Sequence, residues 1–156
     1  MIRDYAPGDL DAVRALVGDT LAEFGFARDM GGVERDLADV ARSYGMDAAD
    51  PVAPRGGFWV AEENGAIVGT VAIRPKSHGV CELKRLYLRA SHRGTGLGQR
   101  LYEHAEAFAR RAGYRTIWLD SSRRFTRAHR LYQRNGFVLV ESLDNEWEDD
   151  VYEKTL

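Results

Sequence analysis

The sequence is poor in cysteine and proline, and it contains no long apolar run. Cys81 is the single cysteine, so an intrachain disulfide is excluded. No stretch of apolar residues approaches the roughly 20 that a membrane-spanning helix requires. The opening residues, MIRDYAPGDL, lack the apolar segment of a secretory signal. We therefore expect a cytoplasmic protein that makes no contact with a membrane.

Length and composition point to one domain. The 156 residues contain no internal repeat and no low-complexity tract, and a chain of this size can bury a core of its own. We therefore expect one domain over residues 1–156. The four histidines, His78, His92, His104 and His129, show no metal-ligand spacing, so we expect no metal ion.

Charge is distributed unevenly along the chain. The net charge is −2, but residues 84–134 hold 13 Lys and Arg against 3 Asp and Glu. A basic segment attracts phosphate groups, although most of its arginines fit the solvated faces of two helices. The negative net charge and the lack of a recognisable nucleic-acid-binding motif argue against nucleic acid as a partner.

The most informative segment is residues 86–112, where a strand end and a polar loop lead into a glycine-rich turn and an amphipathic helix. Gly94, Gly96 and Gly98 leave backbone N–H groups unshielded, and the start of a helix adds unpaired N–H groups and a positive dipole end. This combination predicts a phosphate site. It is not a P-loop, and Gln99 stands where a dinucleotide fingerprint requires its third glycine.

The pattern that remains is R-x-x-G-x-G, formed by Arg93, Gly96 and Gly98. A strand, this turn and a helix, in that order, resemble the coenzyme A diphosphate loop of the GCN5-related N-acetyltransferases, the GNAT superfamily. The resemblance continues through ELKRLYL, RTIWLD and AHRLYQRNGF, which are similar to the family's fourth strand, fifth strand and closing helix. Together the matches cover about residues 58–140 in the family's order.

The resemblance and the hydrophobic patterns predict an α/β fold in which a mixed central sheet opens as a V between its fourth and fifth strands. Asn64-Gly65 predicts a type I′ hairpin, Asp9 and Thr126 are expected helix caps, and Trp59 and Trp118 are expected in the core. The expected strands are residues 2–5, 58–62, 66–74, 80–88, 115–120, 137–143 and 150–155, and the expected helices are about 10–24, 33–44, 97–112 and 127–134.

The strand over residues 80–88 breaks its own alternation, because Lys84 and Arg85 are consecutive polar residues. A β-bulge, which places two residues opposite one, explains this break. The family has a bulge in this strand, and it separates the strand from its parallel neighbour. The resemblance implies that the backbone of Leu86 and Leu88 pairs with the pantetheine arm in the resulting gap.

Acetyl-CoA is the co-substrate that the resemblance implies. Backbone N–H groups of the turn are expected to bind its diphosphate, and Arg93 is expected either to add a charged contact or to cap the loop. Many relatives carry an asparagine where Phe125 stands, so one pantetheine contact is expected to be missing. The implied cofactor-binding residues are Leu86, Tyr87, Leu88, Arg93, Gly94, Thr95, Gly96, Leu97, Gly98, Gln99, Arg100 and Tyr132.

Three residues are candidates for the chemistry of acetyl transfer to an amine. Glu82 occupies the position of a glutamate base in several relatives, and the alternative is a carboxylate paired with Lys84 or an arginine. Tyr132 lies where the family's tyrosine approaches the coenzyme sulfur, and the alternative is a packing tyrosine. The backbone N–H of Leu88 is the candidate for polarising the thioester carbonyl.

The acceptor is expected to be a small or amino-acid-like primary amine, since the segments that shape its site are acidic and aromatic. A non-catalytic acyl-CoA-binding sensor or partner domain is the alternative function, and a homodimer is possible because relatives often dimerise through terminal strands. The acceptor-side residues considered are Phe24, Phe26, Asp29, Tyr44, Asp47, Asp50 and Trp147.

Overall fold

The computed structural model describes residues 1–28, 33–47 and 53–156, with the side chains of Val33 and Glu34 excepted. The described part holds a seven-stranded sheet in the order β1-β2-β3-β4-β5-β7-β6. Its strands are β1 (Ile2–Asp4), β2 (Gly57–Glu63), β3 (Ala66–Ser77), β4 (Val80–Leu88), β5 (Thr116–Ser122), β6 (Val138–Ser142) and β7 (Asp149–Thr155). Its helices are α1 (Leu10–Glu23), α2 (Val33–Ala38), α3 (Val40–Ser43), α4 (Leu97–Arg111) and α5 (Thr126–Arg134), with 3-10 turns η1 (Pro7–Asp9) and η3 (Ala90–His92).

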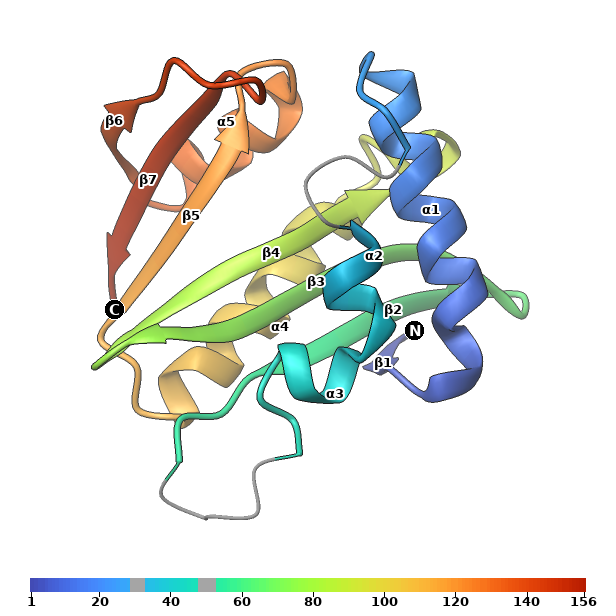
Figure 1. Ribbon diagram of the computed structural model, residues 1–156, viewed down its shortest axis with the longest axis horizontal. Coiled ribbons are helices and arrows are strands. Elements are labelled where there is room, and N and C mark those ends of the chain that lie inside the picture. Colours follow the sequence, from blue (N-terminus) through green and yellow to red (C-terminus); the bar gives the residue numbers. More distant parts are fainter. Residues whose placement is uncertain (29–32, 48–52) are drawn as a thin grey trace.

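Two hydrophobic cores lie on opposite faces of the sheet. Helices α1, α2 and α3 cover one face of β1–β4, and α4 crosses behind the same strands (Figure 1). Apolar residues of α1, α2 and α3 form the first core with Phe58 and Val60 of β2. The second core joins α4 and α5 to Cys81 and Leu83 of β4 and to β5. The strands therefore lie between two helical layers, as the α/β prediction required.

The predicted bulge is present in β4. Lys84 pairs with Ala72 and Tyr87 pairs with Thr70, so Arg85 and Leu86 lie opposite a single residue of β3. Arg85 has a φ of 57°, a conformation that costs a non-glycine residue free energy. The bulge turns the end of β4 away from its parallel neighbour.

The sheet opens directly before this bulge. The parallel pairing of β4 with β5 begins at Val80 and Thr116 and extends as far as Glu82 and Trp118. Beyond that point the two strands diverge (Figure 1), and β5 continues in antiparallel pairing with β7, its only strand partner there among the described residues. The V between the fourth and fifth strands is confirmed, and its apex lies beside Glu82.

The hairpin prediction is confirmed by positive φ values at both turn residues, 51° at Asn64 and 80° at Gly65. The single helix expected over 33–44 is wrong. Asp39 leaves helical geometry, with φ −144° and ψ 84°, and its side chain accepts a hydrogen bond from the N–H of Arg42. The capping interaction divides the segment into α2 and α3.

Further expectations needed correction. Pairing with β7 extends β5 to Ser122, beyond the expected end at Asp120. Thr126 lies inside α5 and is not its cap. Asp9 is the N-cap residue of α1, as expected, but its carboxylate makes no capping hydrogen bond and instead accepts hydrogen bonds from Arg3 and from the N–H of Ala6. Trp118 is half-buried, because α1, α2 and α3 cover only β1–β4 and leave its ring facing Lys76.

Within residues 1–28, 33–47 and 53–156, no helix combines the length and the apolar character needed to cross a bilayer.

Candidate active site

A cavity of about 730 Å³ opens where β4 and β5 diverge. Its walls come from α1, the second half of β4, the glycine turn, the end of β5, α5 and the loop between β6 and β7. The residues that line it include Phe24, Lys84, Arg85, Leu86, Tyr87, Leu88, Arg93, Gly94, Gly96, Gly98, Gln99, Asp120, Ser121, Ser122, Phe125, Arg127, Arg130, Tyr132, Arg134, Trp147 and Asp149.

The glycine turn forms one end of this cavity. Gly94 and Gly96 have φ values of 74° and 86°, which glycine adopts without steric cost. Gly96 is the N-cap of α4, and no described side chain caps the helix there. A Cβ at Gly96 would meet no described atom within 4 Å. The start of α4 is therefore uncapped and open at Gly96, and Gly96, Gly98 and Gln99 line the cavity, as the phosphate-site hypothesis requires.

Side chains around the turn hold its shape. The guanidinium of Arg93 donates to the carboxylate of Glu23 in α1 and to the carbonyl of Leu88, the latter at 3.1 Å. The hydroxyl of Thr95 donates to the carbonyl of His92 at 2.6 Å. Of the two roles expected for Arg93, the geometry therefore supports loop capping.

Not all residues expected at the coenzyme site line the cavity. Thr95, Leu97 and Arg100 lie along a smaller, neighbouring hollow, and the Leu97 side chain is buried in the α4 core. The amide of Gln99 exchanges two hydrogen bonds with that of Asn135, at 2.9 and 2.8 Å. This exchange joins the start of α4 to the end of α5.

Three arginines of α5 also line the cavity, and the sequence analysis did not single them out. Arg127, Arg130 and Arg134 are exposed and lie three and four residues apart, which places them on one helix face. A Cβ at Gly94 would lie 3.5 Å from the guanidinium of Arg127. Their spacing was visible in the sequence, but only the fold shows that this face borders the glycine turn.

The backbone of β4 points into the gap at the expected residues. The N–H of Arg89 donates to the carbonyl of Val68 at 2.8 Å. Since N–H and C=O groups alternate sides along a strand, those of Leu86 and Leu88 face away from β3 and toward β5. The Leu88 carbonyl already accepts a bond from Arg93, so its N–H is the group that remains directed into the gap.

Tyr132 lies on α5 with its ring among Phe137, Tyr152 and His129. It lines the cavity although it is 6% exposed. Burial raises the pKa of the phenol well above its usual value, and the negative charge of Asp120 acts in the same direction. The phenol therefore stays protonated and can donate a hydrogen bond at every working pH.

Glu82 is buried and lies outside the residues that line the cavity. Its carboxylate accepts a hydrogen bond from Arg74 Nε at 2.7 Å and lies 3.7 Å from Lys84 Nζ. Burial lowers the pKa of Lys84, and the Glu82 charge opposes that effect. This placement supports the ion-pair interpretation of Glu82 over the role of a base.

Aromatic side chains close the acceptor side of the cavity. Phe125 packs edge-on against Phe24, with ring centroids 4.9 Å apart, and also contacts Phe26 and Tyr87. The ring of Phe26 lies 4.8 Å from that of Trp147. The rings join the end of α1 to α5 and to the loop before β7, segments far apart in the sequence.

Other expected acceptor-side residues lie elsewhere. Tyr44 is fully buried, and its hydroxyl donates to the carboxylate of Asp36. Asp47 is exposed and does not line the cavity. Asp29 and Asp50 fall outside the described residues.

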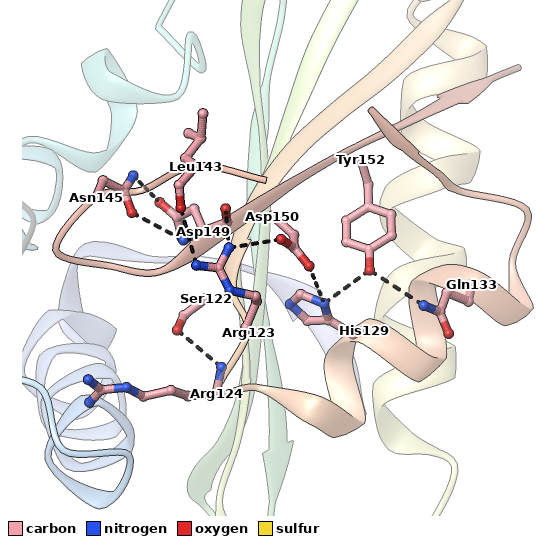
Figure 2. A network of polar contacts seen from close by, with 10 residues as sticks. All are labelled: Ser122, Arg123, Arg124, His129, Gln133, Leu143, Asn145, Asp149, Asp150 and Tyr152. Atoms are coloured by element: carbon pink, nitrogen blue, oxygen red, sulfur yellow. Dashed lines mark hydrogen bonds and ion pairs between the residues drawn. The ribbon is translucent and has the colours of Figure 1, made fainter. Parts of the chain in front are cut away.

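A polar network braces the carboxyl end of β5 against β7 (Figure 2). The Arg123 guanidinium donates to the Asp150 carboxylate at 3.0 Å and to two backbone carbonyls. The amide of Asn145 donates to the Asp149 carboxylate at 3.2 Å, and the hydroxyl of Tyr152 lies 3.1 Å from His129 Nδ1. These contacts hold Asp149 at the cavity wall.

A mixed sheet that opens beside an uncapped glycine turn is the architecture of an acyltransferase with a phosphorylated co-substrate. The model of the acetyltransferase (GNAT) family matches residues 25–137. An uncharacterized N-acetyltransferase of Schizosaccharomyces pombe is 36% identical over 137 residues, which are 86% of this chain and 80% of that protein. The chain belongs to the GNAT family and is an N-acetyltransferase.

Further relatives and solved structures agree. N-acetyltransferase 8 of Mus musculus is 37% identical over 108 residues, which are 65% of this chain and 44% of that protein, so this chain spans less than half of its length. A GNAT acetyltransferase from Staphylococcus aureus superposes with a TM-score of 0.87 at 19% identity, over 99% of this chain and 98% of that chain. PaiA N-acetyltransferase from Thermoplasma acidophilum, solved with coenzyme A, superposes with a TM-score of 0.78 at 22% identity, over 100% and 98%.

Members of the GNAT family use acetyl-CoA, and the residues present here fit that group. The uncapped start of α4 faces open space at Gly96, and exposed arginines of α5 border the same space. Unpaired N–H groups and guanidinium groups are the donors that phosphates bind.

Proposed function

We propose that this protein transfers the acetyl group of acetyl-CoA directly to the primary amine of a small or amino-acid-like acceptor. The observation that carries the proposal is the uncapped glycine turn at one end of a cavity that lies in the gap between β4 and β5. The gap leaves backbone groups of Leu86 and Leu88 without a strand partner on the β5 side.

Acetyl-CoA, when bound, supplies the acetyl thioester. The N–H groups at the start of α4, between Gly96 and Gln99, bind the diphosphate, and Arg127 and Arg130 add positive charge beside it. The N–H of Leu88 donates to the carbonyl oxygen as negative charge develops on it. The Tyr132 hydroxyl donates to the sulfur as the thiolate leaves.

The walls of the cavity support a cationic acceptor. Phe24, Phe125 and Trp147 provide aromatic surface, and Asp120 and Asp149 provide negative charge. Aromatic faces and carboxylates both favour an ammonium group.

Thiol release from acetyl-CoA across a panel of primary amines tests the proposal. Amine-dependent release of CoA, with matching amounts of N-acetyl product by mass spectrometry, is the expected result. Tight acetyl-CoA binding by calorimetry without release for any amine would instead favour an acyl-CoA-binding sensor or partner domain.

We also propose a homodimer through β6, which lies at the edge of the sheet. Its Val138, Leu139 and Val140 are 67%, 51% and 55% exposed, and an apolar edge strand is a template for pairing with another strand. A second copy offers the same edge. Light scattering should give twice the monomer mass for the wild type and the monomer mass for Val140→Lys, whereas a monomeric wild type contradicts the proposal.

A further inference from the structure

The acceptor amine must lose a proton during transfer, and the residue that takes it needs access to the cavity. An alkylamine has a pKa near 10.4, so only about one molecule in a thousand is neutral near pH 7. Glu82 is separated from the cavity and paired with Arg74 and Lys84. A different carboxylate has to be sought among the residues that line the cavity.

The strand register places Asp120 at the required position. Trp118 is the last residue of β5 that pairs with β4, opposite Glu82. Asp120 follows two residues later, so its side chain leaves the same face of the sheet, beyond the point where β4 diverges. Asp120 is exposed and lines the cavity.

Polar side chains from three elements lie within electrostatic range of Asp120. Its negative charge acts toward a higher pKa on Lys84 and Tyr87 of β4, on Tyr132 of α5 and on Asp149 of β7, although burial lowers the pKa of Lys84 overall. Asp120 therefore shares the cavity with polar groups of β4, α5 and β7.

Asp149 strengthens the preference for a cation at this point. Asp120 pairs with Val151 and Ser122 pairs with Asp149, so the two aspartates are diagonal neighbours on one face of the sheet. Burial raises the pKa of Asp149, and the charge of Asp120 adds to the effect. An ammonium group between two carboxylates relieves their repulsion.

We propose that Asp120 is the catalytic base, which binds the acceptor ammonium and accepts its proton. This inference rests on the proposed function. The ammonium first gives one proton to the Asp120 carboxylate, and the neutral nitrogen then forms a bond with the acetyl carbon as the carbon–sulfur bond breaks. The nitrogen loses its second proton, which passes through water or the Tyr132 hydroxyl to the thiolate, so Tyr132 ends protonated. Asp120 returns the first proton to solvent.

The test uses acceptors that differ in amine pKa and hardly in size. Ethylamine and its mono-, di- and trifluoro derivatives serve as probes, because each fluorine lowers the ammonium pKa. Asp120→Asn should lower kcat/KM for ethylamine at pH 7 by about a hundredfold, within the range for loss of a general base. The loss should be less than about threefold for trifluoroethylamine, which is already neutral at pH 7 and does not need Asp120 to remove the first proton.

The pH dependence of kcat/KM distinguishes a catalytic role of Asp120 from a purely structural one, which would leave it unchanged. Without a base the variant depends on amine that is neutral in solution, so the ratio of wild-type to variant kcat/KM for ethylamine should fall as pH rises toward the amine pKa. Asp120→Glu should restore most of the activity. The matched control is Glu153→Gln in β7, an exposed carboxylate outside the cavity, which should match the wild type.

Each result decides between the two proposals. A wild type that releases CoA with these amines, together with an Asp120→Asn variant that is unaffected or equally impaired for all four amines, overturns the role of Asp120 and leaves the proposed function standing. A wild type that binds acetyl-CoA and releases no CoA overturns both. Acetyl-CoA affinity and thermal unfolding of Asp120→Asn should equal those of the wild type.

Discussion

The guanidinium of Arg85 binds both carboxylate oxygens of Asp36, at 2.9 Å from Nε and 2.6 Å from Nη2. Arg85 is the positive-φ residue of the β4 bulge, and Asp36 lies in α2. Their side chains are only 7% and 11% exposed, and the Tyr44 hydroxyl donates to the same carboxylate. The bulge that opens the sheet is thus held by an ion pair from the helical layer.

Removal of this carboxylate should be costly. Asp36→Ala leaves a buried guanidinium without its partner, and we expect the free energy of unfolding to fall by about 3–5 kcal/mol, measured by urea denaturation. The control is Glu148→Ala, which breaks the exposed pair with Arg124 and should leave stability nearly unchanged. Equal effects of the two substitutions would contradict a structural role for the buried pair.

Gly96→Val should weaken acetyl-CoA binding strongly while the protein remains folded. The new side chain projects into the open space in front of the α4 N-terminus, and its positive φ costs about 1–2 kcal/mol. Gly113→Val is a matched control, because Gly113 ends the same helix with a φ of 87° and open space at Cβ. Calorimetry should show at least about a tenfold loss of affinity, equivalent to roughly 1.4 kcal/mol, for Gly96→Val alone. Equal affinities in the two variants would refute the loop assignment.

Tyr132→Phe should lower kcat about tenfold, the value of roughly one hydrogen bond in the transition state, without a change in acetyl-CoA affinity. Burial raises the phenol pKa, so the hydroxyl stays protonated and the ratio of wild-type to variant kcat should be constant between about pH 6 and 9. Tyr114→Phe, which removes a hydrogen bond to the Arg55 carbonyl outside the cavity, should leave kcat unchanged. A ratio that falls steeply with pH would show that the phenol ionises in this range.

Cys81 should be inert to thiol reagents in the folded protein. The side chain is fully buried in the α4 core, and burial raises the pKa of its thiol to about 12. At pH 8 the reactive thiolate is then only about one part in ten thousand. At pH 8 a disulfide reagent should react with one thiol per chain when the protein is unfolded in guanidinium. It should react with no thiol of the native protein. Rapid labelling of the native protein would mean that this part of the core opens.

Features encoded by neighbouring residues could be predicted from the sequence. Asn64-Gly65 specified its turn, the polar doublet Lys84-Arg85 indicated the bulge, and the glycines near Gly96 predicted a bare helix N-terminus. Each of these depends on backbone conformations that a few adjacent side chains allow or forbid, so no distant contact was needed. The prediction of a single helix over residues 33–44 was wrong for a reason that is also local. The side chain of Asp39 caps α3 and interrupts the helix, although the amphipathic pattern continues through it.

Contacts between distant segments were decided by the fold alone. The sequence left two roles open for Glu82 and two for Arg93. The fold places Arg74 2.7 Å from Glu82 and Glu23 beside the guanidinium of Arg93, contacts that favour the structural role of each. In the sequence Asp120 is a single acidic residue at the end of a strand, and its neighbours give no sign of a function. It lines the cavity because β4 has already diverged from β5 at that point. The chemistry of a charged side chain is determined by what lies opposite it, and residues tens of positions away become neighbours only when the chain folds.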